Sequence, residues 1–226
     1  MSLFWPFAAL GILIFVLFLI ERRFPAAVTL FEENVLALLL ATITIVSFAQ
    51  VIARYGFNSG WGGALELTRI LFAWLILFGM SYAIKMNLHL GVDALIRLLP
   101  EKLFRIVAVF GGLTVLLYAA MLLSADWVKP FGGQSSGGAV HYWAKFYKAG
   151  IGLDDLRYPQ WVQQTFGMQE RVQRWVAYLM LPIGLALLAY RALQATFAIT
   201  TGKRELIIAG HEAEDLVAEN KDILKD

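Results

Sequence analysis

The stretch Trp61–Asp93, WGGALELTRILFAWLILFGMSYAIKMNLHLGVD, decides the class of fold. Glu66 and Arg69 stand at its start, and residues 70–84 then carry no formal charge. A helix from Glu66 to Lys85 rises ~30 Å at ~1.5 Å per residue, which matches the hydrocarbon thickness of a bilayer. The stretch therefore predicts a membrane-spanning helix whose charged ends lie at the two interfaces.

The composition extends this class to the whole chain of 226 residues. Hydrophobic residues make up 59% and charged residues 16%, and the mean hydropathy is +0.66. A chain of this composition is far too apolar for an ordinary soluble domain. The absence of cysteine excludes disulfides, thiolate metal sites and cysteine nucleophiles. The net charge of +2 is spread over several segments and does not indicate nucleic-acid binding.

Four further apolar runs bring the prediction to five spans. Residues 3–20 form the first, which we interpret as uncleaved because its basic residues follow the apolar run; a cleaved signal peptide is the alternative. The others cover residues 34–52, 106–125 and 175–198, and an acidic connector with Glu32 and Glu33 precedes the second span. The glycine-rich link before Ala64 predicts a tight antiparallel hairpin of spans two and three. Pro182 is expected to interrupt the last span.

The segments between spans complete the fold class. Residues 91–105 predict an amphipathic helix with an Asp93–Arg97 pair, broken at Pro100. The loop 126–171 is too polar to cross the membrane and too aromatic for a free linker, so it predicts interfacial helices or a small cap. We therefore expect an all-α integral membrane protein, a helical bundle of five transmembrane helices with interfacial amphipathic helices.

Orientation follows from the basic residues of the short connectors. With five spans they all fall on one side, which should be cytoplasmic: Arg22, Arg23, Lys85, Arg97, Lys102, Arg105, Lys203 and Arg204. The N-terminus and the aromatic loop then lie outside, and the C-terminus lies inside.

No enzyme chemistry is visible in the sequence. His89, His141 and His211 all lie in predicted connectors, so they cannot form a facing pair of haem ligands within the bundle. Metalloprotease, hydrolase and phosphate-loop motifs are also absent. We expect no enzymatic activity and no cofactor.

Transport by this chain alone lacks its usual parts. Carriers need polar or ionisable groups near the bilayer centre, and the centres of these spans are apolar. Thr42, Thr44, Ser47 and Gln50 are the exceptions; they favour hydrogen bonds between helices over an ion path. The pattern is typical of a scaffold for another membrane protein.

The charges of the opening stretch have two interpretations. Glu66 and Arg69 can form an ion pair along one helix face, or they can be buried against a partner or against Arg54 and Asn58. Of the two tryptophans in this region, Trp61 suits an interfacial belt, while Trp74, deeper in the span, suits packing against a neighbour. His89 and Asp93 can form a polar cap; two ligands make a poor metal site.

The segment Arg54–Tyr82, RYGFNSGWGGALELTRILFAWLILFGMSY, followed by HLGVDAL at residues 89–95, resembles the small membrane subunit, the DctQ type, of tripartite ATP-independent periplasmic (TRAP) transporters. The resemblance is closest to the C4-dicarboxylate branch. It includes GIGLDDLRYP at residues 150–159 and HEAEDL at residues 211–216. The family's motif residues, expected in structural or partner-interface roles, map onto Arg54, Asn58, Trp61, Glu66, Arg69, Trp74, His89 and Asp93.

The resemblance implies that this chain works in a transporter without binding the substrate or Na⁺ itself. In this family a periplasmic binding protein delivers an organic acid anion to two inner-membrane subunits, and Na⁺ symport, not ATP, drives uptake. The large subunit holds the substrate and Na⁺, and the small one supports it. Asp154, Asp155 and Arg157 are candidates for docking the binding protein. The alternative function is an anchoring or assembly subunit of another membrane complex, such as a respiratory enzyme.

The departure from the family lies at the N-terminus, because the usual pattern has four spans with both ends in the cytoplasm. Residues 1–30 are expected to form an extra transmembrane helix and its connector. Residues 31–201 form the four-helix membrane domain with the extracytoplasmic loop 126–171, and residues 202–226 form an acidic cytoplasmic tail. The extra helix places the N-terminus in the periplasm and leaves the other four spans in their family orientation.

Overall fold

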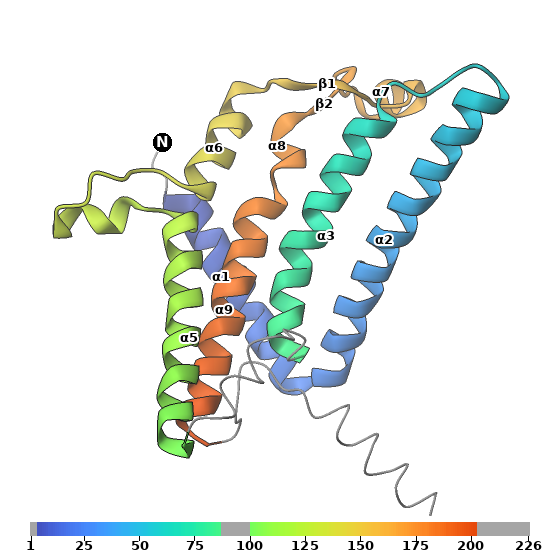
Figure 1. The fold of residues 1–226 in the computed structure, drawn as a ribbon. Helices are drawn as coiled ribbons and strands as arrows, with labels where there is room; N and C mark the ends of the chain where they lie inside the picture. The colour runs from blue at the N-terminus through green and yellow to red at the C-terminus, as the bar shows by residue number, and fades with distance from the viewer. Residues whose placement is uncertain (1–3, 87–99, 203–226) are drawn as a thin grey trace, which may run out of the picture. The chain divides into compact units, whose positions relative to one another are not determined.

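The computed structural model describes residues 4–86 and 100–202, which are almost wholly helical (Figure 1). Five of its helices are long and apolar enough to cross a membrane, which confirms the all-α, five-span prediction. The chain divides into two compact units, residues 1–79 with 120–187 and residues 80–119 with 188–226. The segment around His89 and Asp93 and the acidic tail lie outside the described residues, so the structure does not test what the sequence predicts there.

The first unit opens with two apolar helices, α1 (Phe4–Arg23) and α2 (Pro25–Gly56). Pro25 is the first residue of α2, a position where the missing N–H costs no hydrogen bond. The predicted acidic connector is wrong, because Glu32 and Glu33 lie inside α2. Glutamate is a good helix former, and no glycine or second proline follows Pro25 before residue 34 to stop the helix.

Two threonines of α2 form hydrogen bonds within their own helix. Thr42 Oγ1 donates to the Leu38 carbonyl at 2.7 Å, and Thr44 Oγ1 donates to the Leu40 carbonyl at 2.9 Å. The prediction of hydrogen bonds between helices is therefore wrong for both threonines, since a threonine hydroxyl reaches the carbonyl one turn back without any neighbour.

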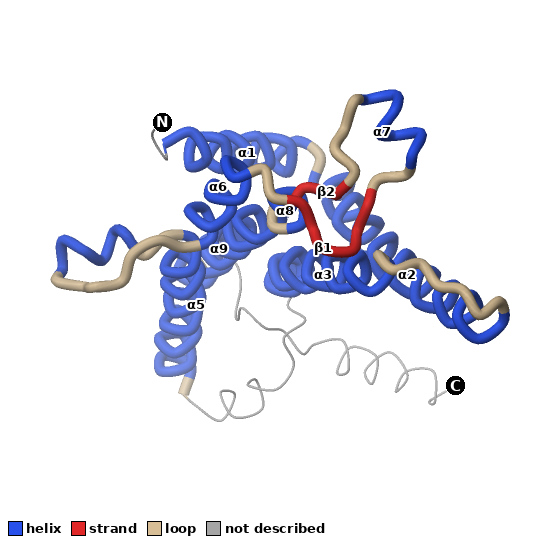
Figure 2. The backbone as a smooth tube through the Cα atoms, turned by 90° about the horizontal axis from the view of Figure 1, so that it is seen from above, coloured by secondary structure: helices blue, strands red, loops and turns tan. Residues whose placement is uncertain are grey.

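The next helix is α3 (Ala64–Met86), of which residues 64–79 belong to this unit. This part diverges from α2 toward their common link (Figures 1 and 2). The predicted tight hairpin is therefore open. Residues 57–63 reach up to about 23 Å when extended, enough to bridge separated helix ends. The link is tied to α2 instead, because the Trp61 N–H donates to Gln50 Oε1 at 3.0 Å.

On its other side α3 packs against the start of the last span, which comprises α8 (Arg174–Ala177) and α9 (Met180–Thr200). Trp74 Nε1 donates to the Ala177 carbonyl at 2.8 Å, so Trp74 contacts a neighbouring helix of the same chain. Gly184 lies so close to Leu77 that a Cβ added to the glycine would stand 2.8 Å from the leucine Cβ. Pro182 lies in the first turn of α9, so the break falls just before it and not inside the helix.

The second unit contains most of α5 (Glu101–Leu123) and the end of α9. Residues 101–105 belong to α5 and not to the predicted amphipathic helix. Pro100 lies outside the helix, and helix formers follow it directly. On α9, Arg191 is buried, and its Nη1 donates to Gln194 Oε1 at 2.8 Å.

Candidate functional site: a folded cap on the membrane helices

Residues 126–173, here called the cap, belong to the first unit. The cap consists of the 3₁₀-helix η1 (Asp126–Phe131), α6 (Ala139–Ala149), β1 (Gly152–Arg157), α7 (Gln160–Phe166) and β2 (Arg171–Gln173). The strands pair antiparallel with an irregularity between Gly152 and Arg157. In Figure 2, β1 lies over the start of α3 and β2 leads into α8. The sequence predicted helices or a cap here, but not this small sheet.

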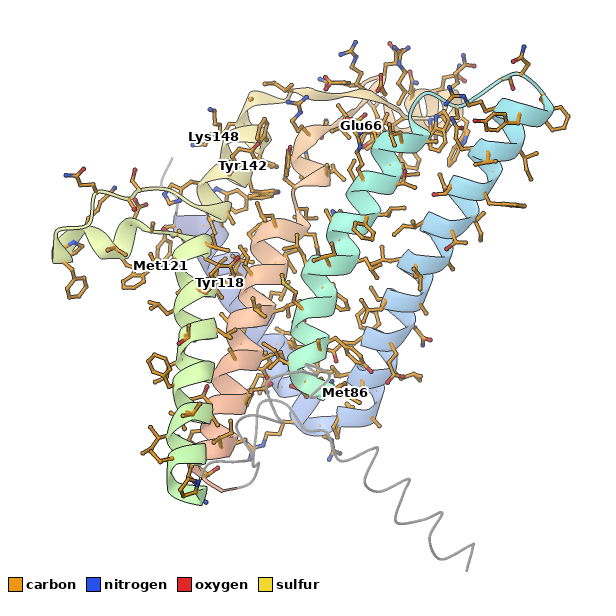
Figure 3. The ribbon with its side chains drawn as sticks, viewed as in Figure 1. Glu66, Met86, Tyr118, Met121, Tyr142 and Lys148 are labelled. Atoms are coloured by element: carbon orange, nitrogen blue, oxygen red, sulfur yellow. The ribbon has the colours of Figure 1, made fainter. Side chains whose placement is uncertain are left out.

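Glu66 ties the cap to the membrane helices. It lies in the first turn of α3 (Figure 3), and its carboxylate accepts three backbone N–H groups of β1. Leu156 N donates at 2.7 Å, Asp155 N at 2.9 Å and Asp154 N at 3.3 Å. Hydrogen bonds from amides to an ionised carboxylate are roughly twice as strong as those between neutral groups. A single side chain thus holds a whole strand against the end of a transmembrane helix.

Gly63 makes this contact possible. A Cβ added to Gly63 would stand 3.1 Å from the Asp155 carbonyl oxygen and from the Leu156 Cα. Any larger residue would therefore push the start of α3 away from β1, and the Glu66 carboxylate with it. Leu153 and Leu156 are buried on the inner side of the strand, while Asp154 and Asp155 are exposed.

Two ion pairs brace the hairpin from its exposed side. Arg174 Nη2 lies 3.2 Å from Asp154 Oδ1, and Arg157 Nη1 lies 2.6 Å from Glu170 Oε1. The Tyr158 N–H also donates to the Glu170 carbonyl at 2.9 Å. The side chains of Asp154, Arg157 and Glu170 are more than half exposed, so each pair contributes little to stability and mainly fixes side-chain positions.

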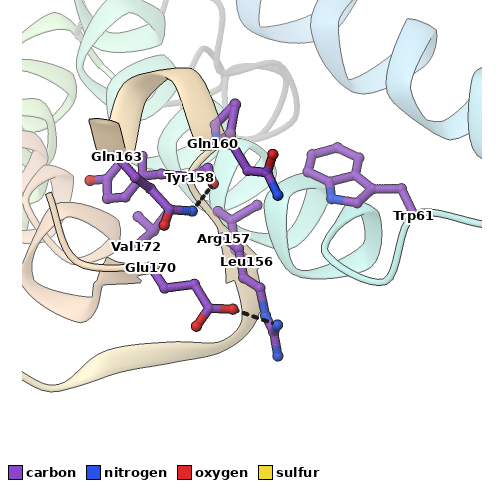
Figure 4. Close-up of a pocket in the computed structure, with 9 residues that line it drawn as sticks. Trp61, Leu156, Arg157, Tyr158, Gln160, Gln163, Glu170 and Val172 are labelled. Carbon is purple, nitrogen blue, oxygen red and sulfur yellow. Dashed lines mark hydrogen bonds and ion pairs between the residues drawn. The ribbon is translucent and has the colours of Figure 1, made fainter. Parts of the chain in front are cut away.

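A pocket of about 620 Å³ lies between this hairpin and the α2–α3 link (Figure 4). Trp61, Tyr158 and Leu156 supply its apolar walls, and Gln160 and Gln163 are among its polar groups. Gln163 is held in place because its Nε2 donates to the Tyr158 carbonyl at 2.7 Å. The pocket therefore offers both an aromatic surface and fixed hydrogen-bonding groups to a visiting side chain.

Asp126 organises the other end of the cap. Its carboxylate lies 2.8 Å from Lys129 Nζ and 2.7 Å from His141 Nε2, and it accepts the Gly137 N–H at 3.2 Å. The hydrogen bonds from Lys129 and Gly137, with the charges of His141 and Lys129, lower the pKa of Asp126 below its usual value. Gly138 completes the turn, because a Cβ there would stand 2.6 Å from the Leu123 carbonyl oxygen.

The structure scatters the residues that the sequence singled out. No ion pair joins Glu66 to Arg69 or to Arg54 within the described ranges. The ion pair along one helix face, one of the two interpretations, is therefore wrong, because the backbone of β1 binds the Glu66 carboxylate. Burial of these charges against a partner subunit stays a prediction. Arg54 and Arg69 are exposed, and Asn58 adopts a positive φ of 47° in the link. The two remaining motif residues, at 89 and 93, lie outside the described ranges.

Sequence reasoning missed three residues that complete the site, namely Gln163, Glu170 and Arg174, and it assigned Gln50 to hydrogen bonds between helices and not to the link. Each binds a residue distant in sequence or a backbone group, and neither kind of pairing leaves a short-range signal. The Asp126–His141 contact had no spacing signal either. Among the described residues no three histidine or acidic side chains come together as a metal site would require.

Comparison with known proteins identifies the family. The family model described as tripartite ATP-independent periplasmic transporters, DctQ component, matches residues 43–202. The C4-dicarboxylate TRAP transporter small permease protein DctQ of Vibrio cholerae is 36% identical over 193 residues, which cover 81% of this chain and 77% of the relative. The protein of the same name from Pseudomonas aeruginosa is 29% identical over 213 residues, which cover 81% of this chain and 89% of that protein.

A third relative is much longer than this chain. The sialic acid TRAP transporter permease protein SiaT of Haemophilus influenzae is 24% identical over 176 residues, which cover 77% of this chain but only 24% of SiaT. The family match spans α3, the cap and α8, the elements that Glu66 and Trp74 join. The chain therefore belongs to the DctQ component family of tripartite ATP-independent periplasmic transporters, as a small permease subunit and not an enzyme.

Proposed function

We propose that this chain is the static scaffold of a TRAP transporter, which supports a large transport subunit and presents its cap to a periplasmic binding protein. The main support for this proposal is the set of three hydrogen bonds from the backbone of β1 to the Glu66 carboxylate. It fastens a folded, polar cap directly to a transmembrane helix, as a docking platform requires. A free loop could not hold charges and a pocket at a fixed position above the bilayer.

The membrane helices supply the surface for the large subunit. In the most apolar 18-residue segment of α2 no residue is buried inside the chain. In the corresponding segment of Arg174–Thr200, 56% of the residues are buried. Such an apolar helix needs lipid or another membrane protein along its length. Within the described spans no three acidic or histidine side chains come together as a metal-ion site would require. We assign the substrate and Na⁺ sites to the large subunit.

The substrate and location follow from the relatives. We propose Na⁺-driven uptake of C4-dicarboxylates, the substrate class in the names of the Vibrio and Pseudomonas proteins. The complex would lie in the bacterial inner membrane with the cap in the periplasm. Contacts of Trp5 with Trp143 and Tyr147 set the start of α1 beside the cap, which agrees with a periplasmic N-terminus and a cytoplasmic C-terminus.

Reconstitution tests the division of labour. The purified chain, its large partner, and both together should be placed in proteoliposomes with an inward Na⁺ gradient and the loaded binding protein outside. Uptake of labelled succinate should require both membrane chains, and it should disappear when the Na⁺ gradient is removed. Uptake by this chain alone would refute the scaffold assignment.

Asp155 tests the docking role of the cap. It is exposed, and within the described residues its side chain has no ion pair, so reversing its charge breaks no internal contact. Asp155→Lys should raise the concentration of binding protein needed for half-maximal uptake about tenfold, while the maximal rate stays unchanged. Asp155→Glu keeps the charge and should behave as the wild type. Equal concentration dependence in all three proteins would exclude docking at this residue.

A further inference from the structure

A second cavity, distinct from the pocket beside Trp61, lies where α1 passes α6 and the start of α9. Its volume is about 120 Å³, and its lining side chains are all apolar; they include Trp5, Ala9, Leu13, Trp143, Leu179 and Ile183. We propose that this cavity binds an acyl chain of an anionic phospholipid. The orientation proposed above would place that lipid in the outer leaflet.

Hydrocarbon is the natural occupant of such a space. A buried water needs two to four polar partners, and this lining supplies almost none. The cavity is also bordered by α1, and only 6% of the most apolar 18-residue segment of α1 is buried. Membrane lipid can therefore reach the cavity from the side of α1. An acyl chain fills it without stranding any polar group.

The aromatic residues around the cavity place it just below the headgroups. Trp5 lies 5.4 Å from Trp143 and 5.7 Å from Tyr147, measured between ring centroids, and Tyr147 lies 5.5 Å from Trp175. Trp143 Nε1 donates to the Trp175 carbonyl at 3.1 Å, so one wall of the cavity is fixed by a hydrogen bond. Tryptophan and tyrosine gather where the hydrocarbon core meets the polar headgroups.

The polar face of α6 supplies the charge that an anionic headgroup requires. Lys145 and Lys148 are exposed, and no hydrogen bond or ion pair holds either one within the part of the chain that the structure describes (Figure 3 labels Lys148). At helical spacing they share a face with His141, while Val140, Trp143 and Ala144 are buried. Exposed lysines close to a membrane surface attract anionic headgroups.

Photolabelling tests the acyl-chain site. The complete transporter should be reconstituted in vesicles of phosphatidylethanolamine and phosphatidylglycerol, the latter carrying a photoreactive group on one acyl chain. Labelled peptides are then located by mass spectrometry. Label should concentrate on the cavity side of α1, around Ala9 and Leu13, and on α6 near Trp143.

Two variants fill the cavity from different helices, Ala9→Phe from α1 and Ile183→Phe from α9. Each should lower the label at the cavity about tenfold, the effect of losing about two buried methylene groups. Gly11→Phe is the matched control, because no atom stands within 4 Å of a Cβ added there. It should leave the label unchanged. Undiminished label in both filling variants would overturn the proposal.

The headgroup is tested by comparing photoreactive phosphatidylglycerol with photoreactive phosphatidylcholine. Wild type should prefer phosphatidylglycerol, and the double variant Lys145→Gln, Lys148→Gln should lose that preference, whereas replacing both lysines by arginine should keep it. Equal labelling by the two lipids in wild type would refute an anionic headgroup. Label at the cavity in the isolated chain but not in the complete transporter would show that the large subunit fills it, which also refutes the lipid site.

Discussion

Glu66 holds two distant parts of the fold together, although the residues near it in sequence suggest only a local ion pair. Its position three residues before Arg69 favours a pair along the helix, but a surface pair of that kind contributes only about 0.3–0.5 kcal/mol. Three hydrogen bonds from the backbone amides of β1 stabilise the carboxylate more. The stronger set of bonds therefore decides where the carboxylate points.

Glu66→Ala should release β1 from α3. Losing hydrogen bonds to a charged acceptor costs about 2 kcal/mol, which corresponds to roughly thirtyfold faster exchange of the amides concerned. Hydrogen exchange at residues 154–156, followed by mass spectrometry, measures this directly. Arg69→Ala is the control and should leave these amides protected. If Arg69→Ala accelerated them as much as Glu66→Ala, the helix pair would be the true support.

Asp126 predicts how acid affects the opposite end of the cap. Because its pKa is lowered in the folded protein, the ionised form stabilises the fold above the usual pKa of an aspartate. That stabilisation is lost as the pH falls through the lowered value. A carboxyl-selective NMR titration should therefore find Asp126 titrating below a free aspartate, and Lys129→Gln should move it upward. An unchanged midpoint in that variant would contradict the bonded arrangement.

At the scale of elements, small residues decide how closely the helices approach. Gly184 lets α9 lie against Leu77 of α3, and the same contact brings Trp74 within reach of the Ala177 carbonyl. Without a hydrophobic driving force between helices in lipid, such close packing with an added hydrogen bond is what holds them together.

Gly184→Val should push α9 away from α3 and destabilise the protein by about 1–3 kcal/mol, the usual cost of overpacking. Gly111→Val in α5 is the matched control, since no atom lies within 4 Å of a Cβ placed there. Thermal unfolding in detergent should show a lower midpoint for the first variant only. Equal midpoints would mean that α3 and α9 are not in this contact.

The elements also show how far sequence reasoning reaches. Spans are predictable because a long apolar run such as residues 70–84 has one stable environment, the bilayer. Helix ends were less predictable, as the continuation of α2 through Glu32 and Glu33 shows, because acidic residues are compatible both with a helix and with a connector. The sheet of the cap escaped prediction, since β1 depends on Glu66, a residue that lies 88 positions before Asp154.

At the scale of the whole molecule, α1 lies outside the residues that match the family model. The family match begins at residue 43, after α1 and part of α2. Yet α1 is integrated into the fold, because Trp5 packs on the rings of Trp143 and Tyr147 in the cap. We therefore expect α1 to stabilise the cap without setting the orientation of the other spans.

A chain lacking residues 2–24 should keep the topology of its remaining four spans. Arg22 and Arg23 are lost with α1, but basic residues at positions 85, 97, 102, 105, 203 and 204 stay on one side and continue to favour the cytoplasm. Because the chain has no cysteine, single cysteines report this without background. Ser135→Cys lies in the exposed part of the cap, and Thr201→Cys lies exposed at the end of the last span.

A membrane-impermeant maleimide should label Ser135→Cys in intact spheroplasts, in the full-length and the shortened chain alike. Thr201→Cys should react only after the membrane is permeabilised. The shortened chain should also unfold at a lower temperature, because the rings of Trp143 and Tyr147 lose their cover. If Ser135→Cys became protected in the shortened chain, α1 would itself set the topology, and the four family spans would depend on the additional one for their direction.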